Sequence, residues 1–258
     1  MDNQEQITRM VKSFGNGAHV FVPKDWAGEQ IQIIKPAKKS LRERILLELD
    51  PYLDSIEGVY LYGSNARSEQ VLDSDIDLFV ITNKKIKINS KGFEILCLKQ
   101  EDIEKAVKIE PLLMYSIFSE CQTIINSKLI ENIKANYEPS LKDFKIFLED
   151  SKRMIKVSEE FLQSENSDYV SGDAVIYSIV LRLRGLFIIH SLLKGKKYST
   201  DLFKKWVKSN LSPTDFDLIY GAYRSSKNEK KFKQKIKVKD LRLLLNFLNK
   251  EIIKLIDG

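Results

Sequence analysis

The sequence predicts an α+β protein in three parts, and three observations carry this prediction. Residues 1–37 hold short apolar runs around a glycine-rich turn, which is typical of a small β module. Residues 38–138 interleave strand-like runs with helical segments, which favours a mixed sheet covered by helices. Residues 139–258 show helical apolar spacing and no convincing strand, so a helical bundle is expected there.

Composition narrows the class of protein. Hydrophobic residues make up 43% of the 258 residues, which is enough for a core and excludes a mainly disordered chain. Two cysteines exclude a disulfide framework and indicate a reducing, cytoplasmic setting, and with two histidines no structural zinc cluster is expected. The formal net charge of +6 is modest and does not force a nucleic-acid function.

Membrane signals are not expected. The N-terminus is polar and acidic, unlike a signal peptide. The most apolar window, Ala174–Leu193, is interrupted by Arg182, Arg184 and His190. A spanning helix needs roughly 20 nearly uncharged residues, so this window is interpreted as a buried helix.

The first part is predicted to hold three short strands. Ile7–Val11 and His19–Val22 flank the turn Gly15-Asn16-Gly17, and Ile31–Ile34 follows a Val-Pro-Lys step. This order resembles the AbrB/SpoVT-like swapped-hairpin module, which implies a homodimer with exchanged strands and contact with DNA. The alternative is a short hairpin that packs on the neighbouring domain.

The central part begins with a helix. Ser40 and Glu43 form a capping box before a stripe of apolar residues, and Asp50-Pro51 ends the helix. The strands expected after it are Val59–Tyr62, Asp75–Ile81 and Phe93–Leu98, and the helices are Glu101–Val107 and Leu112–Ser119.

The third part is predicted to be all helical. Leu141–Phe161 and Ala174–Leu193 are expected helices, and Ser212-Pro213-Thr214-Asp215 is a helix start with proline at its first position. From Val238 to Leu255 apolar residues recur at alternating spacings of three and four, which indicates a helix packed along one stripe.

Two aspartates form the predicted chemical centre. Side chains two apart on a strand point to one face, so Asp75 and Asp77 present two carboxylates side by side. Two close like charges are unfavourable unless a cation neutralises them. Mg²⁺ prefers oxygen ligands and leaves positions open for phosphates, so the pair predicts a magnesium site.

A phosphate-binding turn is predicted just before this pair. Gly63-Ser64 lies where a strand turns into a helix, and glycine lets the backbone approach a phosphate while free N–H groups favour an anion. The Ser64 hydroxyl adds a donor, and Arg67 is expected to reach phosphate oxygens as a bidentate fork. Neither a P-loop nor a dinucleotide fingerprint is present.

These residues resemble the nucleotidyltransferase superfamily of the DNA polymerase β type, especially its minimal and kanamycin-nucleotidyltransferase-like members. The resemblance covers roughly residues 41–130, with Ser68 standing where the family usually has glycine. The positions that match the family pattern Gly-Ser-x-Ala-Arg-Gly…Ser-Asp-x-Asp are Gly63, Ser64, Ala66, Arg67, Ser74, Asp75 and Asp77.

The resemblance implies a function and a set of roles. The protein is expected to move an NMP, AMP from ATP, onto a hydroxyl of a small molecule, protein or RNA and to release pyrophosphate. Two Mg²⁺ ions, replaceable by Mn²⁺, would be held by Asp75, Asp77 and a third acid, with Gly63, Ser64, Arg67 and Ser74 binding the nucleotide. Glu94 is the favoured third acid, and the alternative is an edge-strand carboxylate that faces solvent. Asp73 is interpreted as a turn residue.

Other functions remain open at this point. An antitoxin-like regulator that binds DNA or a toxin through the first part is the main alternative. The third part could be HEPN-like, a helical family whose catalytic members cleave RNA with an arginine and a histidine, but Arg184 and His190 lie six positions apart, which is poor for a shared site on a helix. The lysine-rich run from Lys227 to Lys239 is interpreted as a solvated loop, with nucleic-acid or acidic-partner binding as the alternative.

Overall fold

The structure is a computed structural model that describes residues 7–34, 39–70, 74–211, 215–227, 232 and 234–257. Backbone contacts divide the chain into two compact units, Met1–Arg44 and Ile45–Gly258, and each is described by itself. The α+β class expected from the sequence is confirmed. The domain boundary expected near residue 138 stays a prediction.

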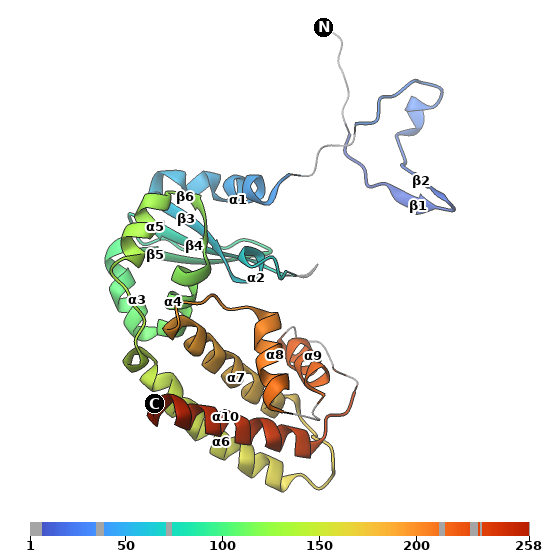
Figure 1. The fold of residues 1–258 in the computed structure, drawn as a ribbon. Helices are drawn as coiled ribbons and strands as arrows, with labels where there is room; N and C mark the ends of the chain where they lie inside the picture. The colour runs from blue at the N-terminus through green and yellow to red at the C-terminus, as the bar shows by residue number, and fades with distance from the viewer. Residues whose placement is uncertain are drawn as a thin grey trace. The chain divides into compact units, whose positions relative to one another are not determined.

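The first unit contains a small β-hairpin (Figure 1). Strands β1 (Lys12–Phe14) and β2 (Gly17–His19) pair antiparallel, with Gly15 in the left-handed region at φ +51°. A 3-10 turn, η1 (Lys24–Trp26), follows. The predicted strand positions are therefore wrong: the tight turn pairs its immediate neighbours, and residues 31–34 form no strand.

The second unit is built on a mixed four-stranded sheet in the order β5-β4-β3-β6. Strand β3 pairs antiparallel with β4 and with β6, and β4 pairs parallel with β5. The short helix α2 joins β3 to the segment before β4. The bounds are β3 (Ile56–Tyr62), α2 (Gly63–Ala66), β4 (Ile76–Thr82), β5 (Phe93–Lys99) and β6 (Gln122–Ile125).

Helices flank the sheet in the order the sequence predicts. The capping box at the first of them is confirmed, because the Ser40 N–H donates to Glu43 at 2.7 Å and the Glu43 N–H donates to the Ser40 hydroxyl at 3.2 Å. Strand β6 and the helix after it were not predicted. The bounds are α1 (Leu41–Leu49), η2 (Asp50–Ser55), η3 (Gln100–Asp102), α3 (Ile103–Ile109), α4 (Pro111–Glu120) and α5 (Ser127–Lys134).

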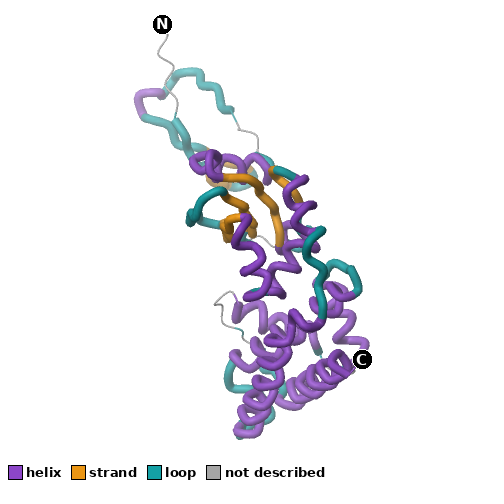
Figure 2. The backbone as a smooth tube through the Cα atoms, turned by 90° about the vertical axis from the view of Figure 1, so that its left-hand side faces the viewer, coloured by secondary structure: helices purple, strands orange, loops and turns teal. Residues whose placement is uncertain are grey.

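Long helices make up the rest of the second unit, and Figure 2 shows them gathered away from the strands. The helical bundle is thus confirmed among the described residues. The predicted helix start at residues 212–214 lies outside them, although the Leu218 N–H does donate to Asp215 at 3.1 Å. The bounds are η4 (Leu141–Phe144), α6 (Lys145–Ser164), α7 (Asp173–Leu193), α8 (Thr200–Asn210), α9 (Phe216–Lys227) and α10 (Val238–Asp257).

Helix α7 is the centre of the bundle. It packs against α9, α6, α10 and α4, and Leu183, Leu186 and Ile189 on it are fully buried. A side chain at Gly185 would overlap the Phe147 ring, so glycine is required for the close approach. In the described part of the chain, α7 is long and apolar enough to cross a membrane by length and composition, but 61% of that window is buried inside the structure.

Candidate active site

The turn after β3 and the carboxylate of Asp77 lie directly against each other. Gly63 has φ +71°, and a Cβ built on it would overlap Asp77 Oδ2. Only glycine fits this position, because both the backbone conformation and the space exclude a side chain. The structure therefore brings together Gly63 from the first half of the sequence pattern and Asp77 from the second half.

The two predicted aspartates sit at the start of β4. Asp77 pairs in register with Tyr62 on β3, and Asp75 lies exposed just before the strand. Asn65 in α2 donates from Nδ2 to the Asp75 carbonyl at 2.8 Å, which ties the turn to this end of β4. Strand pairing with Tyr62 thus holds Asp77 beside the turn, and the Asn65 side chain holds the backbone of Asp75 there.

The charges around Asp77 are unbalanced. Burial, the charge of Glu94 and, less strongly, that of Asp75 raise the pKa of Asp77 to about 6, although Lys227 and Arg67 oppose the shift. Burial and the charges of Asp77, Glu94 and Glu120 also raise the pKa of Tyr62. A half-buried carboxylate among other acids is a position that a cation would stabilise.

Glu94 has features of both interpretations, a third metal ligand and a solvent-facing carboxylate on an edge strand. It lies on the edge strand β5 and is exposed, yet it is in parallel register with Asp77 and its charge acts on that residue. Within the described residues, no group of three His, Cys, Asp or Glu side chains is close enough to hold a metal ion. The donor set is all carboxylate oxygen, which suits Mg²⁺, and phosphate oxygens would complete its coordination. The role of Glu94 stays a prediction.

The two predicted serines flank this centre. Ser64 lies in α2, half-buried, and its carbonyl accepts the Glu69 N–H at 2.9 Å. Ser74 is half-buried and directly precedes Asp75. Asp73 lies outside the described residues. Ser74 is therefore adjacent to Asp75 in the chain and Ser64 belongs to the turn, and the nucleotide contacts of both serines stay predictions.

Arg67 has different partners from those predicted. Its Nη1 contacts both carboxylate oxygens of Glu120 at 2.7 Å, and its Nε donates to Glu69 at 3.0 Å. Burial alone would lower the pKa of Arg67, but these two carboxylates outweigh it and the net pKa is raised. Nη1 and Nε of Arg67 therefore have ion-pair partners within the protein, and the phosphate contact expected for this arginine stays a prediction.

Two hydrogen bonds that were not predicted from the sequence hold the two ends of α2. The Gly63 N–H donates to Glu120 Oε1 at 3.0 Å, and Gln122 Nε2 donates to the Ala66 carbonyl at 2.5 Å. Both side chains come from the junction of α4 and β6. The sequence feature that could have indicated this contact is Glu120, a charged residue at the end of an apolar helix. In the structure Glu120 is 6% exposed. A buried charge of this kind needs a partner.

Ser68 takes a conformation that explains why a glycine is usual there. Its φ is +58°, in the left-handed region that a side chain disfavours. The departure from the family pattern therefore costs backbone strain at the exposed end of the turn.

The other basic candidates lie in separate surroundings. Arg184 Nε donates to Tyr198 at 3.2 Å, whereas the His190 ring faces Trp206 at 6.1 Å and its Nε2 is buried without a hydrogen bond. Among the described residues, the Arg184 and His190 side chains have no hydrogen-bond or ring-contact partner in common. Lys227 ends α9 near Asp77, while residues 228–231 and 233 of the lysine-rich run lie outside the described part.

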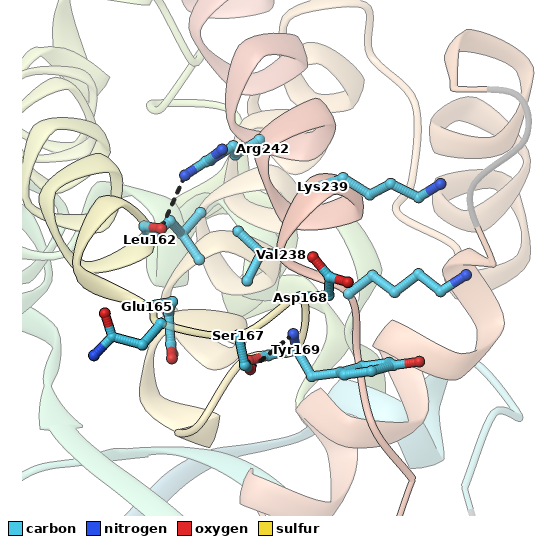
Figure 3. Close-up of a pocket in the computed structure, with 10 residues that line it drawn as sticks. Leu162, Glu165, Ser167, Asp168, Tyr169, Val238, Lys239 and Arg242 are labelled. Atoms are coloured by element: carbon cyan, nitrogen blue, oxygen red, sulfur yellow. Dashed lines mark hydrogen bonds between the residues drawn. The ribbon is translucent and has the colours of Figure 1, made fainter.

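A cavity of about 850 Å³ opens elsewhere, between α6 and α10 (Figure 3). Arg242 and Lys239 line one side and Glu165 and Asp168 the other, and Arg242 donates to the Leu162 carbonyl at 3.0 Å. None of the predicted site residues lines it. The chemistry of the sequence pattern is therefore at the α2 turn and not in this cavity.

Comparison with known proteins agrees with this geometry. Residues 43–130 match the family described as polymerase beta, nucleotidyltransferase. The chain carries a nucleotidyltransferase domain of the DNA polymerase β type. The protein is accordingly a nucleotidyltransferase, an enzyme that transfers an NMP.

One solved structure with detectable similarity is the spectinomycin adenyltransferase from Enterococcus faecialis, determined with ATP and spectinomycin. The two chains are 15% identical, the alignment covers 81% of this chain and 96% of that one, and the TM-score is 0.44. No curated protein sequence matches this chain.

Proposed function

We propose that this nucleotidyltransferase moves AMP from ATP onto a hydroxyl of an acceptor and releases pyrophosphate, with Mg²⁺ as its cofactor. The observation that supports this most is the contact between the Asp77 carboxylate and the Gly63 turn. With Asp77 proposed as the metal-binding acid and the Gly63 turn proposed as the phosphate site, this contact supports the arrangement that a nucleoside triphosphate requires.

Each group then has a role. Asp75 and Asp77, with Glu94 as the third acid, would hold Mg²⁺; a bound divalent ion neutralises phosphate charge and acidifies a hydroxyl. Ser64 and the N–H groups of α2 that follow Gly63 would bind the triphosphate tail, since the Gly63 N–H already donates to Glu120, and the positive charge of Lys227 lies near the same place. The acceptor oxygen bonds to the α-phosphorus, the bond from that phosphorus to the pyrophosphate oxygen breaks, and the hydroxyl proton passes to solvent.

The test uses ATP labelled at either end. With Mg²⁺ and a cell extract as the source of acceptors, label from the α-phosphate should enter an acceptor and label from the γ-phosphate should leave as pyrophosphate. Asp75→Asn and Asp77→Asn should each lower transfer at least a thousandfold, since they remove charge at the reacting centre. Asp54→Asn, an exposed acid outside the site, is the matched control.

Two outcomes would overturn the proposal. Transfer of the γ-label would indicate phosphoryl transfer, and full activity of both Asp75→Asn and Asp77→Asn would remove the site from the reaction.

Glu94→Gln separates the two interpretations of that residue. A loss as large as that of Asp77→Asn supports a metal ligand, and a change below about threefold supports a solvent-facing carboxylate.

We also propose that residues 7–34 bind a protein partner, either a second copy of the chain or a toxin, and not DNA. Apolar side chains such as Met10, Phe14 and Phe21 are each more than 70% exposed there. Exposed apolar surface suits a protein interface, whereas DNA binding requires clustered cations. Light scattering after gel filtration tests the second copy, and a specific gel shift with DNA would contradict the proposal.

A further inference from the structure

Hydrogen bonds around α2 form one connected chain from the nucleotide turn to the helical bundle. Its first link is the Gly63 N–H donating to Glu120 at 3.0 Å. Arg67 then joins Glu120, at 2.7 Å, to Glu69, at 3.0 Å. At the far end Thr200, the first residue of α8, donates to Glu69 through its N–H at 2.8 Å and its hydroxyl at 2.9 Å.

The middle of this chain is buried. The side chains of Arg67 and Glu120 are 12% and 5% exposed. The Arg67 guanidinium also lies over the Tyr198 ring, 5.0 Å from its centroid. Removing one partner of such a pair leaves the other charge buried without compensation, so the arrangement has little freedom to rearrange. Carboxylates and an aromatic ring thus fix the arginine that the sequence pattern would send to a phosphate.

We propose that Arg67 and Glu120 are positioning residues: they set the Gly63–Ser64 turn for the triphosphate, and Arg67 acts through Glu120 without touching phosphate. Because the Asp77 carboxylate packs on Gly63, a displaced turn moves the metal-binding acid and the phosphate donors together. Glu69 and Thr200 extend the same chain to α8, which makes nucleotide affinity depend on the helical bundle. The inference rests on the proposed nucleotide site.

A charge-removing variant distinguishes this role from a direct phosphate contact by the sign of its effect. If Arg67 bound phosphate, Glu120→Gln would release the guanidinium and ATP affinity would hold or rise. The positioning role predicts that Glu120→Gln and Arg67→Met each weaken ATP binding about tenfold, and that the double variant is no weaker than the worse single. Titration calorimetry of the full-length protein with ATP and Mg²⁺ measures this.

The affinity readout also separates positioning from loss of structure. A purely structural defect lowers the folded fraction and hence the apparent kcat, and it raises the apparent Kd for ATP only in inverse proportion to that fraction, so it does not produce a tenfold loss of affinity in a variant that stays mostly folded. Additive losses in the double variant, or unchanged affinity in Glu120→Gln, overturn the inference. If the unmodified protein shows no ATP binding at all, the proposed function itself fails, so the two failures are distinct.

Thr200 provides a test at the far end of the chain, outside the nucleotide site, should Glu120→Gln not fold. Thr200→Val has nearly the same shape and loses the hydroxyl donor to Glu69, whereas Thr200→Ser keeps it. We expect Thr200→Val to weaken ATP binding about threefold to tenfold. The Thr200→Ser variant should bind ATP as tightly as the unmodified protein. Equal ATP affinity in both variants overturns the coupling to the bundle.

Discussion

The two compact units use apolar residues in opposite ways. In residues 7–34 no side chain is buried, and Phe14 and Phe21 are 74% and 73% exposed. In the second unit Phe79, Phe144 and Phe203 are fully buried in one continuous core. A two-stranded hairpin cannot bury its own side chains, whereas a sheet covered by helices can. The second unit is therefore stabilised by its own core, whereas the exposed apolar side chains of residues 7–34 support the proposal that this segment binds a protein partner.

The largest expected effect compares equivalent truncations in the two units. Phe79→Ala should lower the free energy of unfolding by about 3–5 kcal/mol, since it opens a cavity in a packed core. Phe21→Ala should change it by less than about 0.5 kcal/mol. Urea denaturation of the isolated protein measures both. A large loss in Phe21→Ala would show that the hairpin is already buried in solution.

The second prediction concerns the stability that the protein loses when the Asp77 carboxylate is charged. The pKa of Asp77 is raised to about 6 from its ordinary value of 3.8, so the folded protein holds this proton more tightly than the unfolded chain. The stability from this group is therefore present below pH 3.8 and is lost as the pH rises through 6. Asp77→Asn, neutral at every pH, should be about 1–3 kcal/mol more stable near neutral pH without metal.

Unfolding in urea with a chelator, repeated across pH, checks this. The stability difference between Asp77→Asn and the unmodified protein should shrink toward pH 4, where both side chains are neutral. Adding Mg²⁺ should stabilise the unmodified protein and not the variant. A variant that is less stable than the unmodified protein near neutral pH would contradict the charge imbalance at this site.

A smaller effect is expected at the strained turn. Ser68→Gly should raise the free energy of unfolding by about 0.5–1 kcal/mol, because glycine adopts a φ of +58° without strain. Gly15→Ala is the counterpart in the hairpin, where φ is +51°. It should leave the main unfolding transition unchanged, since that hairpin lies in the other unit. Thermal denaturation compares the two variants.

The smallest effect is expected for removal of the first unit up to residue 38, which keeps the capping box of α1. The melting temperature should stay within about 2 °C and nucleotidyl transfer within about twofold, because core and site belong to the second unit. A loss of transfer without a loss of melting temperature would place a substrate or partner contact in the hairpin and would sharpen its role.

Local patterns account for what could be predicted of the site. Alternation along a strand predicted that Asp75 and Asp77 lie beside each other, although Asp75 precedes β4, and a glycine before a helix predicted the turn at Gly63. Helix periodicity predicted the bundle and its last helix up to Leu255. These features depend on residues close in the chain, so they can be recognised without the fold. The hairpin strands were misplaced because short, permissive segments pair in more than one register.

By itself, the amino-acid order predicted a nucleotidyltransferase domain with an acidic centre next to a glycine–serine turn. The tertiary structure alone decided the partners of Arg67, the hydrogen bond from the Gly63 N–H to Glu120, and the edge position of Glu94. Gly63 and Glu120 are 57 residues apart, and Glu69 and Thr200 are 131 residues apart. Contacts over such separations have no local signature, because which segments meet depends on how the whole core packs.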